Sequence, residues 1–157
     1  MAVPMYLARD RNRFTKELQS LVGRSKKKDA VNQTAERLRA ANEMLEAVVK
    51  PLFESYADLV RQVGRTCDYK VLPGSSESHP LRSAVADFLV DLSGVPGLSE
   101  YYLRFENDGD DIWKVTSRPR LDGKGLHYDV CEITLPVTDK LPSAIEGTLQ
   151  QFIRRTF

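Results

Sequence analysis

The chain has 157 residues, which fits one domain of ordinary size with a core of its own. Its hydrophobic fraction of 41% and charged fraction of 29% are typical of a globular protein, and they exclude a wholly disordered chain. No run approaches the roughly 20 apolar residues that cross a bilayer, and the first residues are too poor in apolar length for a secretory signal. We therefore expect a cytoplasmic protein without a transmembrane segment.

The formal net charge of +1 conceals an uneven distribution along the chain. Residues 1–40 contain ten Lys or Arg against four Asp or Glu, a local charge of 10 − 4 = +6, whereas residues 71–157 contain nine against thirteen, or 9 − 13 = −4. A basic segment of this kind attracts anions such as nucleic-acid phosphates or lipid headgroups. The candidate anion-binding residues are Arg9, Arg11, Arg13, Lys16, Lys26, Lys27 and Lys28.

Residues 1–28 are predicted to form a basic amphipathic arm. Gly23 is well placed to end a short helix there, and the polar stretch GRSKKKD then predicts a break. After the break, Asp29 can cap a second helix. The apolar residues that recur at helical spacing in the arm are Phe14, Leu18 and Leu21.

The segment 29–66 is predicted to be one long helix with a coiled-coil pattern in residues 29–50. Mostly apolar residues recur there every seven positions in two series that are offset by four, which is the a and d pattern of a coiled coil. An amide at an a position of such a seam can pair with its symmetry mate and fix the register. We predict that the seam consists of Leu38, Asn42, Leu45 and Val49.

Pro51 interrupts this helix. Inside a helix, a proline removes one hydrogen bond and clashes with the carbonyl four positions earlier, at a cost of about 3 kcal/mol. We therefore predict a kink at Pro51, and we place residues 51–66, whose apolar face is broader, in the globular core. The sequence leaves open whether the stripe before Pro51 pairs within one chain, as a helical hairpin with the first helix, or between chains.

The second half of the chain shows the alternation of apolar and polar residues that is typical of strands. Residues 101–106 and 112–115 alternate in this way around the turn NDGD, which predicts a β-hairpin. A second turn at 121–125 and a long third strand at 126–137, with a bulge near Cys131, complete a predicted antiparallel meander. A short strand is also predicted at 68–72.

Helices are predicted to accompany this sheet. One begins at Pro80, and another begins at Pro142 with a capping box of Ser143 and Glu146. Residues 67–157 are therefore predicted to form an α+β domain in which helices cover a small antiparallel sheet.

No cluster of residues in the sequence predicts catalysis or a cofactor. Cys67 and Cys131 lack the spacing of a disulfide framework or a metal knuckle, and the glycine motifs that bind phosphate are absent. His127, Asp129 and Cys131 are the residue types of a thiol nucleophile with its base, but positions 127 and 131 of a regular strand lie about 13 Å apart. We therefore expect no enzymatic activity, no cofactor and no metal site.

The expected function is that of a non-enzymatic interaction or assembly module. It associates through its coiled-coil-like helix, with a second copy or another protein as its partner. The alternative is a nucleic-acid-associated protein whose basic arm binds the phosphate backbone. The sequence leaves open whether the arm binds nucleic acid, lipid or nothing.

Overall fold

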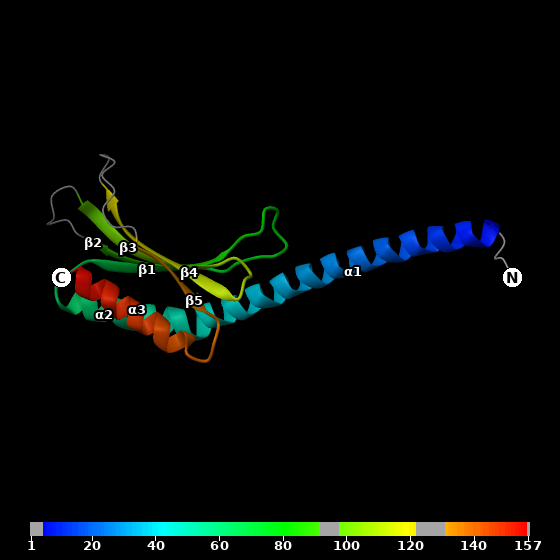
Figure 1. Cartoon of the computed structure of the whole chain (residues 1–157). Helices are drawn as coiled ribbons and strands as arrows, with labels where there is room; N and C mark the ends of the chain where they lie inside the picture. Colours follow the sequence, from blue (N-terminus) through cyan, green and yellow to red (C-terminus); the bar gives the residue numbers. More distant parts are fainter. Residues whose placement is uncertain (1–4, 92–97, 122–130, 157) are drawn as a thin grey trace.

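The computed structural model describes residues 5–91, 98–121 and 131–156 (Figure 1). A long helix comes first, then five strands, then a C-terminal helix, so the fold is of the α+β class. The long helix has three parts, which are α1 (Met5–Met44), the π-helical turn η1 (Leu45–Val49) and α2 (Lys50–Gln62). The strands and the last helix are β1 (Cys67–Leu72), β2 (Ala84–Asp91), β3 (Leu98–Asn107), β4 (Ile112–Leu121), β5 (Cys131–Pro136) and α3 (Leu141–Arg155).

The five strands form one antiparallel sheet in the order β1-β2-β3-β4-β5, so each strand pairs with its neighbours in sequence. The predicted hairpin is present as β3 and β4. Asn107 is buried at its turn, where its Nδ2 donates to the carbonyls of Asp110 and Ile112 and its Oδ1 accepts from the N–H of Gly109. Gly109 has a φ of +87°, a conformation that favours glycine. The antiparallel meander is therefore as predicted.

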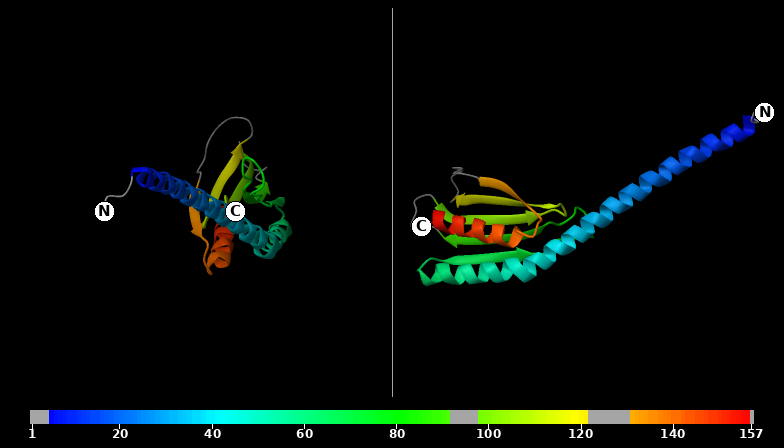
Figure 2. Two further views of the ribbon diagram at one scale, coloured as in Figure 1. Left: turned by 90° about the vertical axis from the view of Figure 1, so that its right-hand side faces the viewer. Right: turned by 60° about the horizontal axis from the view of Figure 1, so that its bottom comes forward.

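The sheet has one covered face and one open face (Figures 1 and 2). Helices α2 and α3 lie side by side on the same face of the sheet. Along β2, buried and half-buried residues alternate, as expected for a strand with one face on the core. Charged side chains such as Asp87 and Arg104, which form an ion pair at 2.8 Å, occupy the open face.

Aromatic rings join the two layers of the core. Phe53 of α2 contacts Phe88 of β2 and Phe105 of β3, with ring centroids 5.4 and 5.8 Å apart. Phe152 of α3 contacts Phe88 with a centroid distance of 6.1 Å and an edge-to-face geometry. Such pairs stabilise a core beyond the burial of their surface area. Both helices are thus held to the sheet through the same central ring.

Helix α1 is continuous from Met5 to Met44, so the predicted break after Gly23 is wrong. A single glycine inside a helix costs only about 1 kcal/mol relative to alanine, and the Lys and Arg residues around it are good helix formers. Asp29 consequently lies inside the helix instead of at an N-terminus. Residues 5–62 therefore form one continuous long helix and not a hairpin of two helices. No helix in the described part of the chain is both long and apolar enough to cross a membrane.

Pro51 is accommodated by the π-helical turn that precedes it. The buried residues Leu45, Val49, Phe53 and Ala57 recur every four positions across this junction. A regular α-helix has 3.6 residues per turn, so this spacing would rotate successive side chains away from the core. The N–H that follows the turn donates to the carbonyl of Leu45, which makes a wider turn and keeps these side chains on one face. The helix restarts as α2 with Pro51 in its first turn, and its direction changes there (Figure 2).

Two further local predictions differ from the structure. The helix predicted from Pro80 is wrong, because this segment contains the strand β2. An apolar run of this length fits the periodicity of a helix and that of a strand, and its pairing with β1 and β3 makes it a strand. Helix α3 has no side-chain cap hydrogen bond, so the capping box of Ser143 and Glu146 is absent. Strand β5 pairs with β4 in one register from Cys131 onward, and residues 126–130 lie outside the described ranges.

Candidate functional site

Three of the residues predicted to form an association seam lie in the core of their own chain. Leu38, Leu45 and Val49 have exposed fractions of 2%, 1% and 0%. They belong to the same hydrophobic cluster as Phe88 of the sheet and Leu141 of α3. These contacts fill, within one chain, the positions that we predicted to face a partner.

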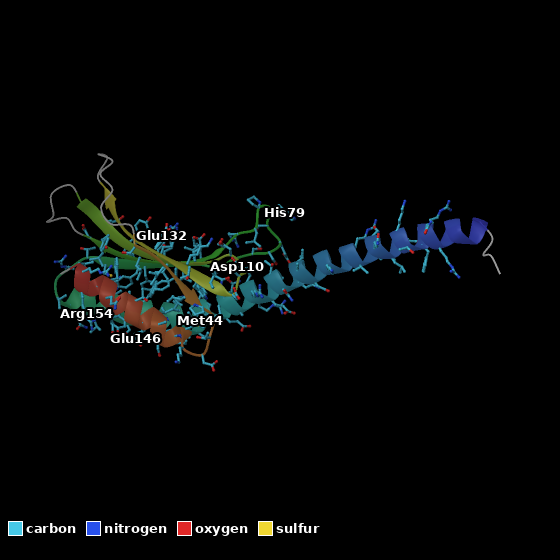
Figure 3. The ribbon with its side chains drawn as sticks, viewed as in Figure 1. Met44, His79, Asp110, Glu132, Glu146 and Arg154 are labelled. Atoms are coloured by element: carbon cyan, nitrogen blue, oxygen red, sulfur yellow. The ribbon has the colours of Figure 1, made fainter. Side chains whose placement is uncertain are left out.

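Asn42, the fourth of these residues, pairs with a loop of its own chain. Its Nδ2 donates to the carbonyl of Gly74 at 3.0 Å, and its Oδ1 accepts from the N–H of Gly74 at 2.8 Å. A Cβ at Gly74 would lie 2.7 Å from the backbone N of Ala84 and 2.8 Å from Leu38 Cδ2, so only glycine fits this close approach. Asn42 thus ties α1 to the loop between β1 and β2, whose outer end carries His79 (Figure 3).

The N-terminal part of α1 projects away from the sheet and from the other helices (Figure 1). Every described side chain between Arg11 and Gln33 is exposed, and partial burial begins at Thr34 and Ala35. Residues 5–33, which we call the projecting arm, span roughly 43 Å at 1.5 Å per residue. Most helices in proteins depend on the packing of one face. The described side chains of the projecting arm lack that packing within this chain.

One side of the projecting arm is apolar. Four residues follow the spacing i, i+4, i+7 and i+8, which places them along one face of a helix. Full burial of a side chain of this kind is worth about 1.5–3 kcal/mol, so a partner that covers them gains several kcal/mol. We call this set the apolar stripe. It consists of Phe14, Leu18, Leu21 and Val22, with exposed fractions of 58%, 46%, 51% and 52%.

The side of the arm opposite the apolar stripe is basic. Lys16 lies roughly half a turn from the centre of the stripe around the helix axis, Arg13 and Arg24 lie about a third of a turn from it, and all three are exposed. Arg11 lies on the side of the stripe and Lys26 lies between the two sides, so the candidate anion-binding residues do not form one surface. The remaining candidate anion-binding residues lie in α1, and their side chains are outside the described part of the structure. These residues are Arg9, Lys27 and Lys28.

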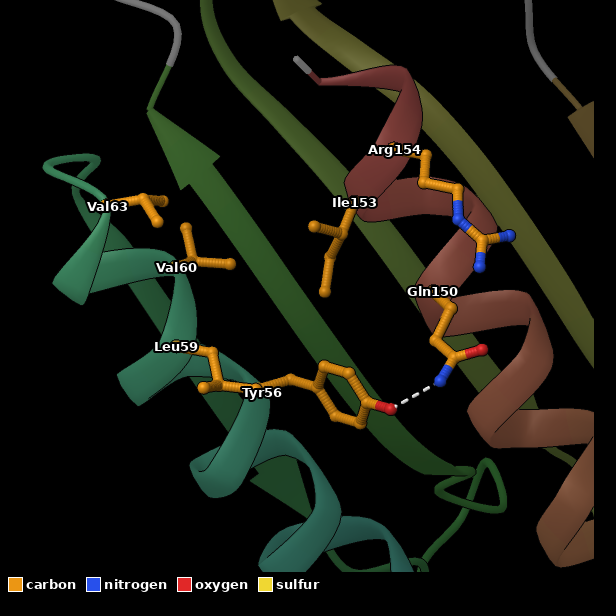
Figure 4. Close-up of a pocket in the computed structure, with 7 residues that line it drawn as sticks. All are labelled: Tyr56, Leu59, Val60, Val63, Gln150, Ile153 and Arg154. Carbon is orange, nitrogen blue, oxygen red and sulfur yellow. Dashed lines mark hydrogen bonds between the residues drawn. The ribbon is translucent and has the colours of Figure 1, made fainter.

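A groove of about 300 Å³ separates α2 from α3 (Figure 4). Leu59 and Val63 of α2 line it with exposed apolar side chains. The Tyr56 hydroxyl donates to Glu146 Oε1 at 2.8 Å and accepts from Gln150 Nε2 at 2.6 Å. These hydrogen bonds of Tyr56 tie the two helices together beside the groove.

The acidic turn between β3 and β4 is held by contacts to neighbouring strands. Ser83 donates a hydrogen bond to Asp108, and Lys114 Nζ lies 3.0 Å from Asp108 Oδ2. These two contacts lower the pKa of Asp108 below its ordinary value of 3.8. Asp108 therefore stabilises the turn when its carboxylate is ionised.

The described residues bring together few chemically reactive groups. Burial raises the pKa of the Cys67 thiol to about 11, which keeps it protonated at neutral pH. Within the described ranges, no three His, Cys, Asp or Glu side chains come together as a metal-binding group. His127 and Asp129 lie outside those ranges, and so does the side chain of Cys131.

Comparison with known proteins gives no relative from which a site can be transferred. The sequence matches no family model, no curated protein and no solved structure at a significant level. Function is therefore argued from the geometry of this chain. The feature that the geometry singles out is the projecting arm, with the apolar stripe on one side and basic residues on the other.

The sequence contains the spacing of the apolar stripe, but it does not show that the stripe is exposed. Leu38 and Leu45, seven residues apart, share one face of a helix, and so do Leu18 and Leu21, three residues apart. The signal that could have distinguished the two pairs is the charge of the longer segments, because residues 5–33 contain eight Lys or Arg against three Asp or Glu, and residues 34–62 contain four against five. A face that packs on its own sheet is seldom so rich in Lys and Arg.

Proposed function

We propose that this chain is a non-enzymatic assembly module that associates with another protein chain through the projecting arm. The observation that carries the proposal is the apolar stripe, in which about half of the surface of each side chain is exposed. Apolar residues at this spacing are what a partner helix covers when two helices pair. The association surface then lies nearer the N-terminus than the range 29–50 that the heptad pattern favours.

The anchoring of the arm supports this function. Leu38 and Leu45 fix the base of α1 in the core, and the two hydrogen bonds of Asn42 hold it against Gly74. The domain therefore presents the apolar stripe on a helix whose base is fixed. A surface that is ordered before binding loses less conformational entropy when it binds.

Light scattering of the wild type and of two lysine variants tests the proposal. Leu18→Lys places a charge within the apolar stripe, whereas Ser20→Lys places the same charge on the opposite side of the arm. At high micromolar concentration, we expect the wild type and Ser20→Lys to exceed the mass of one chain, 17.8 kDa, and Leu18→Lys to have the mass of one chain. A wild type that remains at 17.8 kDa over a roughly hundredfold range of concentration would rule out self-association through the arm.

A second candidate function is the binding of a nucleic-acid backbone by the basic side of the arm. Arg13, Lys16 and Arg24 are exposed there, and among the described residues none of the three forms an ion pair. Affinity for a short DNA duplex should then fall steeply with salt concentration. Replacing all three by Gln should lower the slope of log K against log salt concentration by about one unit for each phosphate that is no longer neutralised. An affinity for the duplex that does not change with salt concentration would contradict this function.

A further inference from the structure

We propose that the partner of the projecting arm is a second copy of this chain, paired with it in antiparallel orientation. In this pair, Arg11 of each copy lies against Asp29 of the partner subunit. The proposal rests on the proposed function, because it names the occupant of the same apolar stripe. What carries it is the placement of two opposite charges at the two ends of that stripe.

Arg11 and Asp29 are placed symmetrically about the apolar stripe. Arg11 lies seven residues before Leu18, and Asp29 lies seven residues after Val22. Seven residues make about two helical turns, so both charged side chains fall on the same side of the helix as the stripe. Ser20 is the midpoint between Arg11 and Asp29, and it is also the midpoint between Leu18 and Val22. Arg11 and Asp29 are exposed, and neither forms an ion pair among the described residues.

A twofold axis at the level of Ser20 brings these groups into complementary positions. Leu18 of each copy then lies level with Val22 of the partner subunit, which places apolar residues of both copies at the centre of the contact. Arg11 lies level with Asp29 of the partner subunit at both ends. Opposite charges that flank an apolar seam are what sets the orientation of paired helices.

Parallel pairing of the same surface is opposed by the same charges. Equal positions face each other in a parallel pair, so Arg11 would meet Arg11 of the partner subunit and Asp29 would meet Asp29 of the partner subunit. Both ends of the stripe would then carry like charges, which repel. The antiparallel pair also sets the dipoles of the two helices in opposite directions. Charge complementarity therefore selects the antiparallel orientation.

The length of the projecting arm and its basic side are both compatible with this pair. Residues 5–33 have their midpoint at position 19, so an axis at Ser20 covers nearly the whole arm and leaves the two domains at opposite ends. Lys16 points away from the contact in both copies, and Arg13 and Arg24 lie beside it. The excess positive charge of the arm therefore lies on the outer sides of the pair, where water and salt screen it.

Charge reversal with mixing tests the orientation. In Arg11→Glu and in Asp29→Lys, both ends of a pair carry like charges. In an equimolar mixture of the two variants, each mixed pair has opposite charges at both ends. At low salt, we expect each variant alone to dissociate with a Kd about tenfold above that of the wild type, and the mixture to return to within about threefold of it. The control Arg13→Glu, on the basic side, should stay within about twofold.

The possible results separate the orientation from the function. Antiparallel pairing is wrong if neither single variant is weakened, or if the mixture is as weak as the single variants. Association through the apolar stripe stands in either case when Leu18→Lys dissociates. If the wild type itself has the mass of one chain, the antiparallel pair is wrong, and the proposed function then requires a different protein as the partner of the arm. Weakening of both single variants together with recovery in the mixture supports the antiparallel pair. In a parallel pair, each single variant keeps like charges at both ends, as the wild type does, and is not weakened, whereas the mixture gains opposite charges at both ends and associates more tightly than the wild type.

Discussion

The side chain of Asn42 holds the base of the projecting arm against the domain. Its carboxamide offers a donor and an acceptor side by side, and both are used on the backbone of Gly74, at 3.0 and 2.8 Å. Gly74 in turn lies so close to α1 that a Cβ there would meet Leu38 Cδ2 at 2.8 Å. One residue thus joins the loop between β1 and β2 to the helix that carries the apolar stripe.

Replacing Asn42 by Leu should destabilise the domain. The variant keeps a side chain of similar size but leaves the N–H and the carbonyl of Gly74 without their partner. Loss of a partner by buried polar groups costs about 1–3 kcal/mol, so we expect the free energy of unfolding in urea to fall by that amount. Asn32→Leu makes the same change at an exposed position of α1 and should alter stability by less than about 0.5 kcal/mol.

The same variant distinguishes two roles for this amide. If Asn42 holds its own loop, then Asn42→Leu should have the same association state as the wild type. A change from a defined dimer to mixed or higher oligomers would instead indicate that the amide pairs between chains and fixes a register. Light scattering under conditions where both proteins are folded measures this difference.

Asp108 should make the stability of the domain depend on pH. The hydroxyl of Ser83 and the ammonium group of Lys114 hold the pKa of its carboxyl below 3.8 in the folded state. A group whose pKa is lowered on folding contributes stability above its unfolded pKa, and this contribution is lost as the pH falls through its folded pKa. Ser83→Ala should therefore reduce the free energy of unfolding at pH 7, and the difference from the wild type should shrink below about pH 4. Urea titrations at both values check this, and a difference that stays constant would contradict it.

At the scale of elements, helices α2 and α3 depend on each other across the groove between them. Tyr56 of α2 is the link, since its hydroxyl bonds to both Glu146 and Gln150 of α3. Tyr56→Phe removes these two hydrogen bonds and leaves the ring in place, so we expect a loss of about 1 kcal/mol in the free energy of unfolding. Tyr69→Phe is the matched control, because the Tyr69 hydroxyl has no hydrogen-bond partner among the described residues. Equal effects of the two changes on urea unfolding would contradict this role.

The elements that could be predicted from the sequence are those whose signal is local. The hairpin of β3 and β4 follows from alternation around a glycine-containing turn, and α3 follows from its proline and its apolar spacing. Strand β2 was predicted as a helix because its apolar run fits both periods, and its neighbours in the sheet decide the outcome. The continuity of α1 across Gly23 was missed because a glycine ends a helix only when its surroundings favour an end.

At the scale of the whole molecule, the chain consists of a domain with a completed core and an arm without one. Apolar residues at helical spacing occur in both parts, so the sequence could not separate Leu38 and Leu45, which pack on the sheet, from Leu18 and Leu21, which are exposed. That difference arises from contacts with residues far away in the sequence. The positive charge of residues 5–33, which contain eight Lys or Arg and three Asp or Glu, is evident in the sequence, and this range is the part of the helix that the domain does not cover.

Hydrogen exchange at two protein concentrations shows whether a second copy of the chain covers the projecting arm. If the arm is an association surface, amides in residues 11–33 should be protected at about 100 μM and should lose that protection at about 1 μM, while those of β2 and β3 do not change. In Leu18→Lys, the amides of the arm should exchange rapidly at both concentrations. Exchange in residues 11–33 that is independent of concentration in the wild type would contradict self-association through the arm.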